Sequence, residues 1–314
     1  MQKTIKELNV NENFKGNLLL KSCSLKKTSK GSYYLDVVLA DASGQMPAKL
    51  WTVSDLMVSA PPTAGNVAYV EFSVEDYNGS PQARLSIINQ IEDLSGVNLS
   101  ELVPCAPADP ETMYNFIVHT ASALDQDYKN VILAAYERNK ASILSLPAAK
   151  SVHHDFIGGL LYHTGKMLQT ANMLCKIYPE INRDLLLAGV ILHDIAKIKE
   201  FSTSKIGLVE DYSVEGNLLG HITMGVVYVS ELCKEFNVPA EKSMLLQHMI
   251  LAHHGEPEMG SPIVPKILEA KLLNLCDNID AQVQIFTKAT SDIDPGSFSE
   301  RVFALGTSAY KPKL

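Results

Sequence analysis

The chain has 314 residues, of which 46% are hydrophobic, so it can bury one large core or two ordinary ones, and its length favours about two domains. Its formal net charge of −8 argues against broad electrostatic binding to phosphate backbones, which rewards basic surfaces. Any contact with nucleic acid therefore has to be local or assisted by metal ions.

The cysteines and the absence of long apolar runs indicate the cellular compartment that we expect for the protein. The five cysteines are widely scattered without a C-x-x-C pair, which argues against a disulfide framework and against a thiolate zinc site. The start, MQKTIKELNVNENF, is polar, and no apolar run approaches the roughly 20 residues that a membrane span requires. We therefore expect a cytoplasmic protein with reduced thiols and no membrane partner.

Five segments near the N-terminus are rich in β-branched, aromatic and leucine residues, which is typical of strands. Turn signals such as DASGQ and YNGSP separate them. The predicted strands are residues 17–25, 33–40, 46–51, 67–75 and 82–91. Hairpin-like breaks and one longer excursion after the third strand predict a small closed barrel of the OB type. A five-stranded sheet packed on later helices is the alternative.

Basic and aromatic residues in this first module could bind single-stranded nucleic acid. Lys26, Lys27 and Lys30 lie around the first turn, and Tyr33 and Trp51 supply rings on which bases could stack. The alternative is that the lysines are only solvated and the aromatic residues only fill the core. Tyr33 and Tyr34 are adjacent, so in a strand they face opposite sides and at most one of them can be a core residue.

The pattern of apolar residues changes after the predicted strands. Residues 94–110 contain three prolines and no clear periodicity, which predicts a linker. From Glu111 to about Thr287, apolar residues recur three and four positions apart, as in amphipathic helices, without a strong strand signal. The predicted domains are an OB-like nucleic-acid-binding module at 1–93, the linker at 94–110, a helical domain at 111–290 and a C-terminal tail at 291–314.

Histidines are concentrated in the helical domain: eight of nine fall between residues 153 and 254. His193 and Asp194 end the apolar run LLLAGVIL, where a buried carboxylate is costly unless a cation compensates its charge. Any single histidine has a simpler explanation, since a buried imidazole commonly bonds a backbone carbonyl. The whole set, with its nitrogen and oxygen donors, indicates a site for Mn²⁺, Fe²⁺, Co²⁺, Mg²⁺ or Zn²⁺.

The reaction expected from such a site is hydrolysis of a phosphate ester. Two ions about 3.5–4 Å apart would activate a water molecule and stabilise the leaving oxygen. Lys197 lies three residues after Asp194, so it shares the same helix face and could bind a substrate phosphate oxygen. The alternative for Lys197 is an exposed lysine near a helix end.

The ordered set His163, His193, Asp194, His221, His253, His254 and Asp277 resembles the HD-domain superfamily of metal-dependent phosphohydrolases, whose fold is an all-helical bundle. The sequence segments around these residues resemble the YhaM family of bacterial 3′→5′ exoribonucleases. The segments are HHDFIGGLLYH (153–163), RDLLLAGVILHDIAKIKE (183–200), VEGNLLGHI (214–222), LLQHMILAHHG (245–255) and FSERVFALGTSAYKP (298–312). The resemblance implies a chain of mixed α and β structure, with a five-stranded OB-like barrel followed by an all-helical HD domain.

The resemblance also implies the metal ligands. His163, His193, Asp194 and Asp277 would hold one ion, and Asp194 would bridge to a second ion held by His221 and by His253 or His254. His153 and His154 belong to the family wording, and a contact with substrate phosphate is one of the roles open to them, beside core or capping roles. Where the family usually carries an aromatic residue before Gly-Ser-Pro, this chain has Met259, so we expect a weaker stacking contact there.

The activity that the resemblance implies is hydrolysis of the terminal phosphodiester at the 3′ end of single-stranded RNA, with single-stranded DNA as a second possible substrate and Mn²⁺ as the favoured ion. One alternative is an HD phosphohydrolase acting on a cyclic nucleotide or a nucleoside triphosphate. Another is a nucleic-acid-binding protein whose metal site is structural. The apolar stretches VQIF (283–286) and VFAL (302–305) could mediate homo-oligomerisation.

Overall fold

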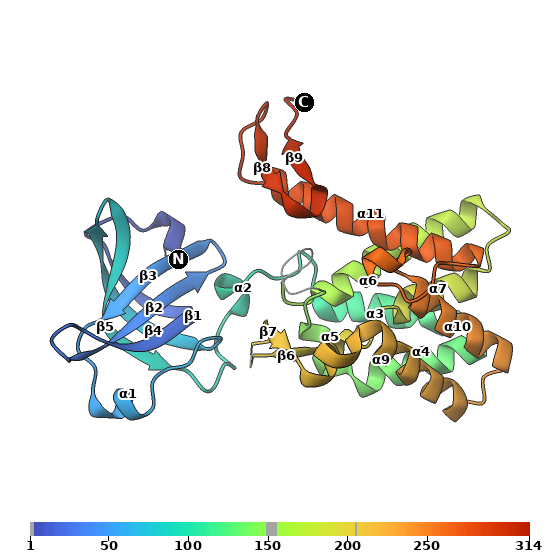
Figure 1. The fold of residues 1–314 in the computed structure, drawn as a ribbon, viewed down its shortest axis with the longest axis horizontal. Helices are drawn as coiled ribbons and strands as arrows, with labels where there is room; N and C mark the ends of the chain where they lie inside the picture. The colour runs from blue at the N-terminus through green and yellow to red at the C-terminus, as the bar shows by residue number, and fades with distance from the viewer. Residues whose placement is uncertain (1–2, 149–155, 205) are drawn as a thin grey trace. The chain divides into compact units, whose positions relative to one another are not determined.

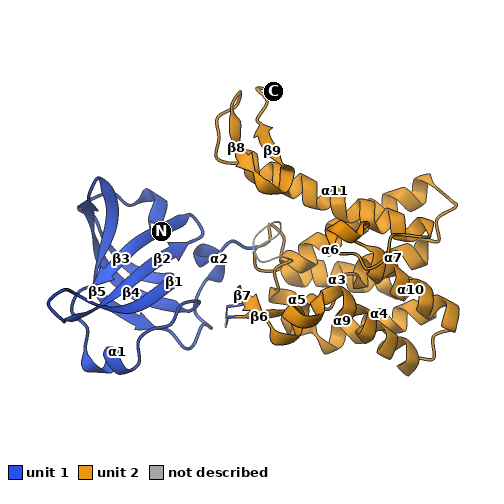
Figure 2. Ribbon diagram, in the orientation of Figure 1, with its two compact units in different colours: residues 1–105, 204–208 blue, residues 106–203, 209–314 orange. Residues whose placement is uncertain are grey.

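The computed structural model describes residues 3–148, 156–204 and 206–314 (Figure 1). The chain divides into two compact units, which Figure 2 draws in different colours. The first unit is Met1–Cys105 with Ser204–Leu208, and the second is Ala106–Thr203 with Val209–Leu314. A separate cluster of buried apolar side chains fills each unit, so each has a core of its own.

The first unit is a closed barrel of five strands. The strands are β1 (Asn13–Lys27), β2 (Tyr33–Asp41), β3 (Gly44–Leu50), β4 (Val67–Tyr77) and β5 (Ser80–Gln90), in the order β1-β2-β3-β5-β4. The barrel closes because β1 pairs with both β2 and β4. β3 and β5 pair in parallel, whereas the other neighbours are antiparallel. The predicted OB-like barrel and its five strands are confirmed.

Alternation of side chains explains why these segments form a barrel. In β2 the side chains of Leu35, Val37 and Leu39 are buried, whereas Tyr34 and Asp36 between them remain half-exposed on the outer face. The 3₁₀ helix η1 (Ile5–Glu7) precedes β1. The longer excursion after β3 contains α1 (Asp55–Ser59), whose N-cap Ser54 accepts a hydrogen bond from the amide of Met57.

The segment predicted as a linker contains a short helix, α2 (Leu99–Leu102). Its N-cap Asn98 accepts a hydrogen bond from the amide of Ser100, and Leu102 and Val103 are buried. Periodicity could not reveal it, because a helix of one turn is too short to repeat an apolar pattern.

The second unit is built around α7 (Arg183–Leu192), which is buried from its third residue onward. Leu185 through Leu192 are all buried, which is expected for a helix that is apolar on every side. Helices α3, α4, α6, α10 and α11 contact α7. The helices of the unit are α3 (Pro110–Ser122), α4 (Gln126–Arg138), α5 (Lys140–Ser145), α6 (Gly159–Ile177), α7, α8 (Lys197–Glu200), α9 (Val214–Glu235), α10 (Ala240–Ala252) and α11 (Leu268–Thr290).

Two short hairpins accompany the helices and were not predicted. β6 (Phe201–Thr203) pairs with β7 (Val209–Tyr212), and β8 (Phe298–Val302) pairs with β9 (Thr307–Tyr310) around η3 (Phe303–Leu305). Strands of three to five residues are too short for a recognisable alternation. The segment predicted as a tail thus forms a hairpin at the end of α11 (Figure 1).

Two further predictions concern self-association and membrane spans. Val283, Phe286 and Phe303, which lie in the stretches suggested for self-association, have exposed side chains. Within the described part of the chain, no helix combines the length and the apolar character that crossing a membrane would need.

Candidate metal centre

The predicted metal ligands come together in the second unit from five separate helical segments. His163 lies on α6, His193 and Asp194 follow α7, and His221 lies within α9. His253 and His254 follow α10, and Asp277 lies on α11. They form two groups in which the donor atoms of different residues all lie within 4.8 Å of one another: His163, His193 and Asp277, and His221, His253 and His254.

Asp194 lies between the two groups and faces them with different oxygen atoms. Its Oδ2 is 3.2 Å from Nε2 of His193, on the side of the first group. Its Oδ1 is 3.4 Å from Nε2 of His221 and 3.7 Å from Nε2 of His253, on the side of the second group. This is the arrangement that a carboxylate bridging two cations requires.

The ends of two helices place three of these residues. α7 is buried from Leu185 to its C-terminal end, so the His193-Asp194 pair that follows it lies in the interior. α10 ends at Ala252 with His253 as its C-cap, and the chain leaves through Gly255 at φ +87°, a conformation that glycine adopts without strain. A Cβ atom at Gly255 would also lie 2.7 Å from the amide nitrogen of Asn274, which donates a hydrogen bond to the carbonyl of His253.

Every imidazole of the centre uses Nδ1 for a hydrogen bond to an oxygen atom outside the cluster. Where that oxygen is a backbone carbonyl, Nδ1 must carry the proton, so Nε2 offers its lone pair to the centre. The Nδ1 partners are Asp280 (2.7 Å) for His163, the Val190 carbonyl (2.9 Å) for His193, Glu200 (2.9 Å) for His221, the Ile250 carbonyl (2.7 Å) for His253 and the Met259 carbonyl (2.9 Å) for His254.

Several inward-facing atoms are buried without compensation. Among the described residues, no hydrogen-bond partner exists for Nε2 of His193, His221 and His253 or for Oδ1 of Asp194. Leaving such atoms unsatisfied costs about 1–3 kcal/mol each, so their clustering calls for a ligand. Imidazole nitrogens and carboxylate oxygens around a shared point fit a divalent cation.

The carboxylates of the centre are held in their charged form. Burial alone would raise the pKa of Asp194, but the Lys197 ammonium and the His193 ring lower that pKa well below its ordinary value. Burial would likewise raise the pKa of Asp277, whereas its hydrogen bond with His163 lowers it well below the usual range. Both side chains can therefore offer anionic oxygens to a cation at neutral pH.

The histidines differ between the two groups. Burial lowers the pKa of His253 well below its ordinary value, and burial also lowers the pKa of His254. Burial disfavours a charged His163 as well, yet the neighbouring Asp277 and Asp280 outweigh it and raise the pKa of His163 to about 9. His253 and His254 are therefore ready to bind a cation, whereas a cation at the first group must displace a proton from His163.

Lys197 is buried rather than exposed, so the alternative of a solvated lysine at a helix end is wrong. Its Nζ lies 2.7 Å from Oδ2 of Asp194 and donates a hydrogen bond of 2.7 Å to the carbonyl of Ala148. The ammonium therefore neutralises the central carboxylate in addition to any contact with substrate.

The three other histidines between residues 153 and 254 are His153, His154 and His248, and Met259 is the remaining residue named from the sequence. His153 and His154 lie outside the described residues. His248 accepts a hydrogen bond from the amide of Lys266 and takes no part in the two groups. Met259, at the end of η2 (Pro257–Met259), binds His254 through its backbone while its side chain is exposed.

The nucleic-acid candidates all have exposed side chains in the first unit. Lys26 pairs with Asp36, and the ammonium of Lys27 lies 4.8 Å from the ring centroid of Tyr33. Lys30 is exposed in the turn after β1, and Trp51 is exposed and stacks on Tyr34 with centroids 5.1 Å apart. Neither Tyr33, which is exposed, nor the half-buried Tyr34 is a core residue.

Two residues at these candidate sites were not identified from the sequence. The ammonium of Lys49 lies 5.9, 5.2 and 5.5 Å from the ring centroids of Tyr34, Trp51 and Tyr77. The available signal was its position two residues before Trp51, which places both side chains on one face of a strand. Glu200, which accepts a hydrogen bond from His221, is the second, and no local sequence pattern signals this contact across 21 positions.

Comparison with known proteins agrees with this geometry. Residues 160–282 match the HD domain family. The chain is 37% identical over 316 residues to a protein of Bacillus subtilis (strain 168), covering 99% of both chains. It is 36% identical to a protein of Oceanobacillus iheyensis, covering 97% of this chain and 96% of that one, and 35% identical to one of Listeria welshimeri, covering 99% of both. All three are named 3′-5′ exoribonuclease YhaM.

Among solved structures, the second OB-fold domain of replication protein A from Methanococcus maripaludis aligns with 30% of this chain and 97% of its own. The sequence identity is 19% and the TM-score is 0.24, which is too low to support any further argument. The relatives of full length are decisive instead: with more than a third of its residues identical over nearly the whole sequence, this chain belongs to the YhaM family.

Proposed function

We propose that this protein is a metal-dependent 3′-5′ exoribonuclease that hydrolyses phosphodiester bonds at the 3′ end of single-stranded RNA. The observation that carries the proposal is the position of Asp194, whose two oxygens face two groups of three donor residues each. The type of reaction and of substrate comes from the relatives, which are named 3′-5′ exoribonucleases at 34–37% identity.

We propose two divalent ions at this centre. His163, His193, Asp194 and Asp277 would hold one of them, and Asp194 with His221, His253 and His254 would hold the other. When bound, the ions supply an activated water molecule and neutralise charge on the phosphate. Mn²⁺ is the first ion to test, and Fe²⁺, Co²⁺, Mg²⁺ and Zn²⁺ suit the same nitrogen and oxygen donors.

Side chains beyond the ligands support this chemistry. Lys197 keeps a positive charge against the shared carboxylate, where it would also stabilise negative charge that develops on the phosphate. The barrel, within residues 1–93, would bind RNA through Lys26, Lys27, Lys30, Tyr33 and Trp51 by charge and stacking. Residues 111–290 would carry out hydrolysis, and residues 94–110 would join the two.

The test uses metal-stripped protein and single-stranded RNA labelled at its 5′ end. With Mn²⁺ added, products should shorten from the 3′ end in single-nucleotide steps, and without a metal the RNA should stay intact. The same reaction with single-stranded DNA measures the breadth of the substrate class. If RNA stays intact with all five metals while a cyclic nucleotide or a nucleoside triphosphate is hydrolysed, the proposal is wrong and the small-nucleotide alternative is correct.

A further inference from the structure

Glu200 makes the contacts expected of a residue that positions His221. We infer that Glu200 fixes the backbone and the ring of His221 together and thereby aims Nε2 of His221 at the second group of donors. The inference rests on the proposed two-ion function. It concerns a positioning role, because Glu200 acts through His221 rather than by contacting the reacting atoms.

A single carboxylate oxygen makes both contacts. Oε1 of Glu200 accepts a hydrogen bond of 2.9 Å from the backbone N–H of His221 and lies 2.9 Å from its ring Nδ1. Glu200 is buried, with 6% of its surface exposed, so water does not compete effectively for these bonds. Because an anionic carboxylate can only accept, Nδ1 donates this bond, and Nε2 is the nitrogen that faces Asp194, 3.4 Å from its Oδ1.

A break in α9 explains why His221 needs such an anchor. Gly220 has φ +69° and ψ 155°, which is not helical, and the chain therefore turns immediately before His221. His193 and His253 differ, because each follows an unbroken helix and bonds the carbonyl three residues earlier, Val190 or Ile250. Their helices orient those two rings, whereas His221 depends on a carboxylate from a different segment.

The backbone of Glu200 anchors the other end of the same turn. Its carbonyl accepts a hydrogen bond of 2.8 Å from the amide of Ser213, the N-cap of α9. A Cβ atom at Gly216 would lie only 2.2 Å from that carbonyl oxygen, so the first turn of α9 packs directly on Glu200. Glu200 therefore holds the start of α9 through its backbone and the break at Gly220 through its side chain.

The two groups of donors have matching arrangements. In the first group, Asp280 lies 2.7 Å from Nδ1 of His163, and in the second group Glu200 lies 2.9 Å from Nδ1 of His221. Each carboxylate serves one group only. Replacing Glu200 should therefore weaken the second ion and spare the first, a selectivity that general loss of structure would not produce.

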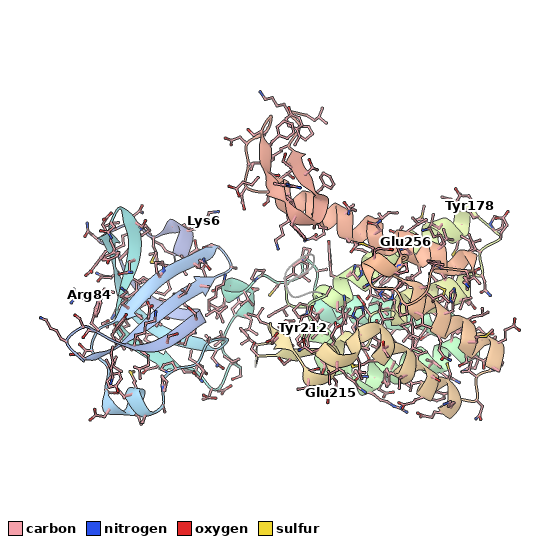
Figure 3. The ribbon with its side chains drawn as sticks, viewed as in Figure 1. Lys6, Arg84, Tyr178, Tyr212, Glu215 and Glu256 are labelled. Carbon is pink, nitrogen blue, oxygen red and sulfur yellow. The ribbon has the colours of Figure 1, made fainter. Side chains whose placement is uncertain are left out.

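The test measures Mn²⁺ stoichiometry and the affinity of each ion by calorimetric titration of metal-stripped protein. We expect two ions in the unmodified protein, and in Glu200→Ala a second ion bound about 10–100-fold more weakly, the usual effect of removing a residue that orients a ligand. Affinity for the first ion should not change. Glu215→Ala is the matched control, because Glu215 is exposed on the first turn of α9 (Figure 3).

Two further variants, Glu200→Gln and His221→Ala, complete the test. Glu200→Gln keeps an acceptor oxygen but loses the charge, so its second-ion affinity should fall between the unmodified protein and the Ala variant. In His221→Ala the same ion should weaken, and adding Glu200→Ala to it should weaken that ion no further. If Glu200→Ala fails to fold, the Gln variant decides, and an unchanged second-ion affinity in it contradicts the inference.

The number of ions bound by the unmodified protein distinguishes an error in the role of Glu200 from an error in the proposed function. Two ions in the unmodified protein, bound with equal affinity in Glu200→Ala, would overturn the role of Glu200 and leave the proposed function standing. A single ion in the unmodified protein would overturn the two-ion proposal, and this inference with it.

Discussion

The ammonium nitrogen of Lys197 lies 2.7 Å from Oδ2 of Asp194, and both side chains are buried at the metal centre. Lys197 also donates to the carbonyl of Ala148, so it links the residue after α7 to the segment after α5. Without a cation, this pair is the main local balance of the Asp194 charge, since burial opposes that charge.

Replacing Lys197 by Met keeps the length of the side chain and removes its charge. In the metal-free protein this should lower the free energy of unfolding by about 3–5 kcal/mol, because Asp194 stays buried without its ammonium partner. Saturating Mn²⁺ should reduce that loss, because the ions replace the missing positive charge. Urea unfolding with and without Mn²⁺ measures both values, and Lys199→Met at an exposed position is the control. Equal losses under both conditions would show that Lys197 contributes packing rather than charge.

Replacing Asp194 by Asn should abolish hydrolysis and leave the fold largely intact. The amide keeps the shape of the side chain, but it offers only one neutral oxygen where the carboxylate offers an anionic oxygen to each group. We expect the turnover of RNA to fall by at least about a hundredfold. The check is the rate of 3′ shortening at saturating Mn²⁺, with circular dichroism to follow the fold. Near-normal turnover would refute the bridging role.

The candidate ligands could be named from the sequence because each lies in a segment that resembles the family, and the structure brings them together. The sharing of these ligands between two groups could not, since it depends on which oxygen of Asp194 faces His193 and which faces His221. Glu200 was missed for a similar reason: it contacts His221 across 21 positions and a break in α9. No local pattern encodes that pairing.

The binding of Mn²⁺ should strengthen as the pH rises from 6.5 toward 9. The pKa of His163 is raised to about 9, so below that pH a proton occupies the ring and an ion must displace it. One displaced proton corresponds to an affinity gain of up to about tenfold per pH unit, and the gain ends once the pH exceeds that pKa. Calorimetry at pH 6.5, 7.5 and 8.5 in two buffers gives the affinity and the number of protons released.

The free energy of unfolding of the metal-free protein should fall as the pH rises, whereas the affinity for Mn²⁺ rises. A raised pKa in the folded state means that charged His163 stabilises the fold fully below its unfolded pKa of about 6.5, and that this contribution is lost as the pH rises toward 9. Asp280→Asn removes a cause of the shift, so both pH dependences should weaken in that variant. An affinity for Mn²⁺ that does not vary with pH would contradict the proton displacement.

The strands of the barrel could be predicted from their β-branched, aromatic and leucine residues and from the turn signals between them, and strands such as β2 bury every second residue, as Leu35, Val37 and Leu39 show. The face that could bind RNA was predictable only in part. Trp51 was identified, whereas Lys49 was not, because its approach to three rings depends on β3 lying between β2 and β5 in the closed barrel.

Replacing Lys26, Lys27 and Lys30 together by Ala should weaken RNA binding and its dependence on salt. Each contact with a phosphate contributes about 0.7 to the slope of log affinity against log salt for single strands, so the slope should fall by up to about 2. The loss should be smaller than three free lysines would give, because Lys26 is paired with Asp36. Anisotropy titrations of labelled RNA at several salt concentrations measure the slope.

The control for the lysine variant separates binding from hydrolysis. Hydrolysis of a small chromogenic diester should not change in the triple variant, since it needs only the metal centre. A second triple variant at Lys6, Lys176 and Lys234, all exposed, makes the same charge change elsewhere and should retain RNA affinity. Equal losses on RNA and on the small diester would remove the barrel from substrate capture.

Trp51 offers a direct optical test of stacking, because it is the single tryptophan of the chain. Its ring is 46% exposed and stacks on Tyr34 on one side, so a nucleobase can reach the remaining surface. Bound RNA should quench its fluorescence, and Trp51→Ala should weaken RNA binding by about 1–3 kcal/mol, the usual value of one base stacked on an aromatic side chain. Leu56→Ala removes another exposed apolar side chain of the barrel and should leave the affinity unchanged. Fluorescence that does not change at saturating RNA, together with unaltered affinity in Trp51→Ala, would show that RNA does not use this face.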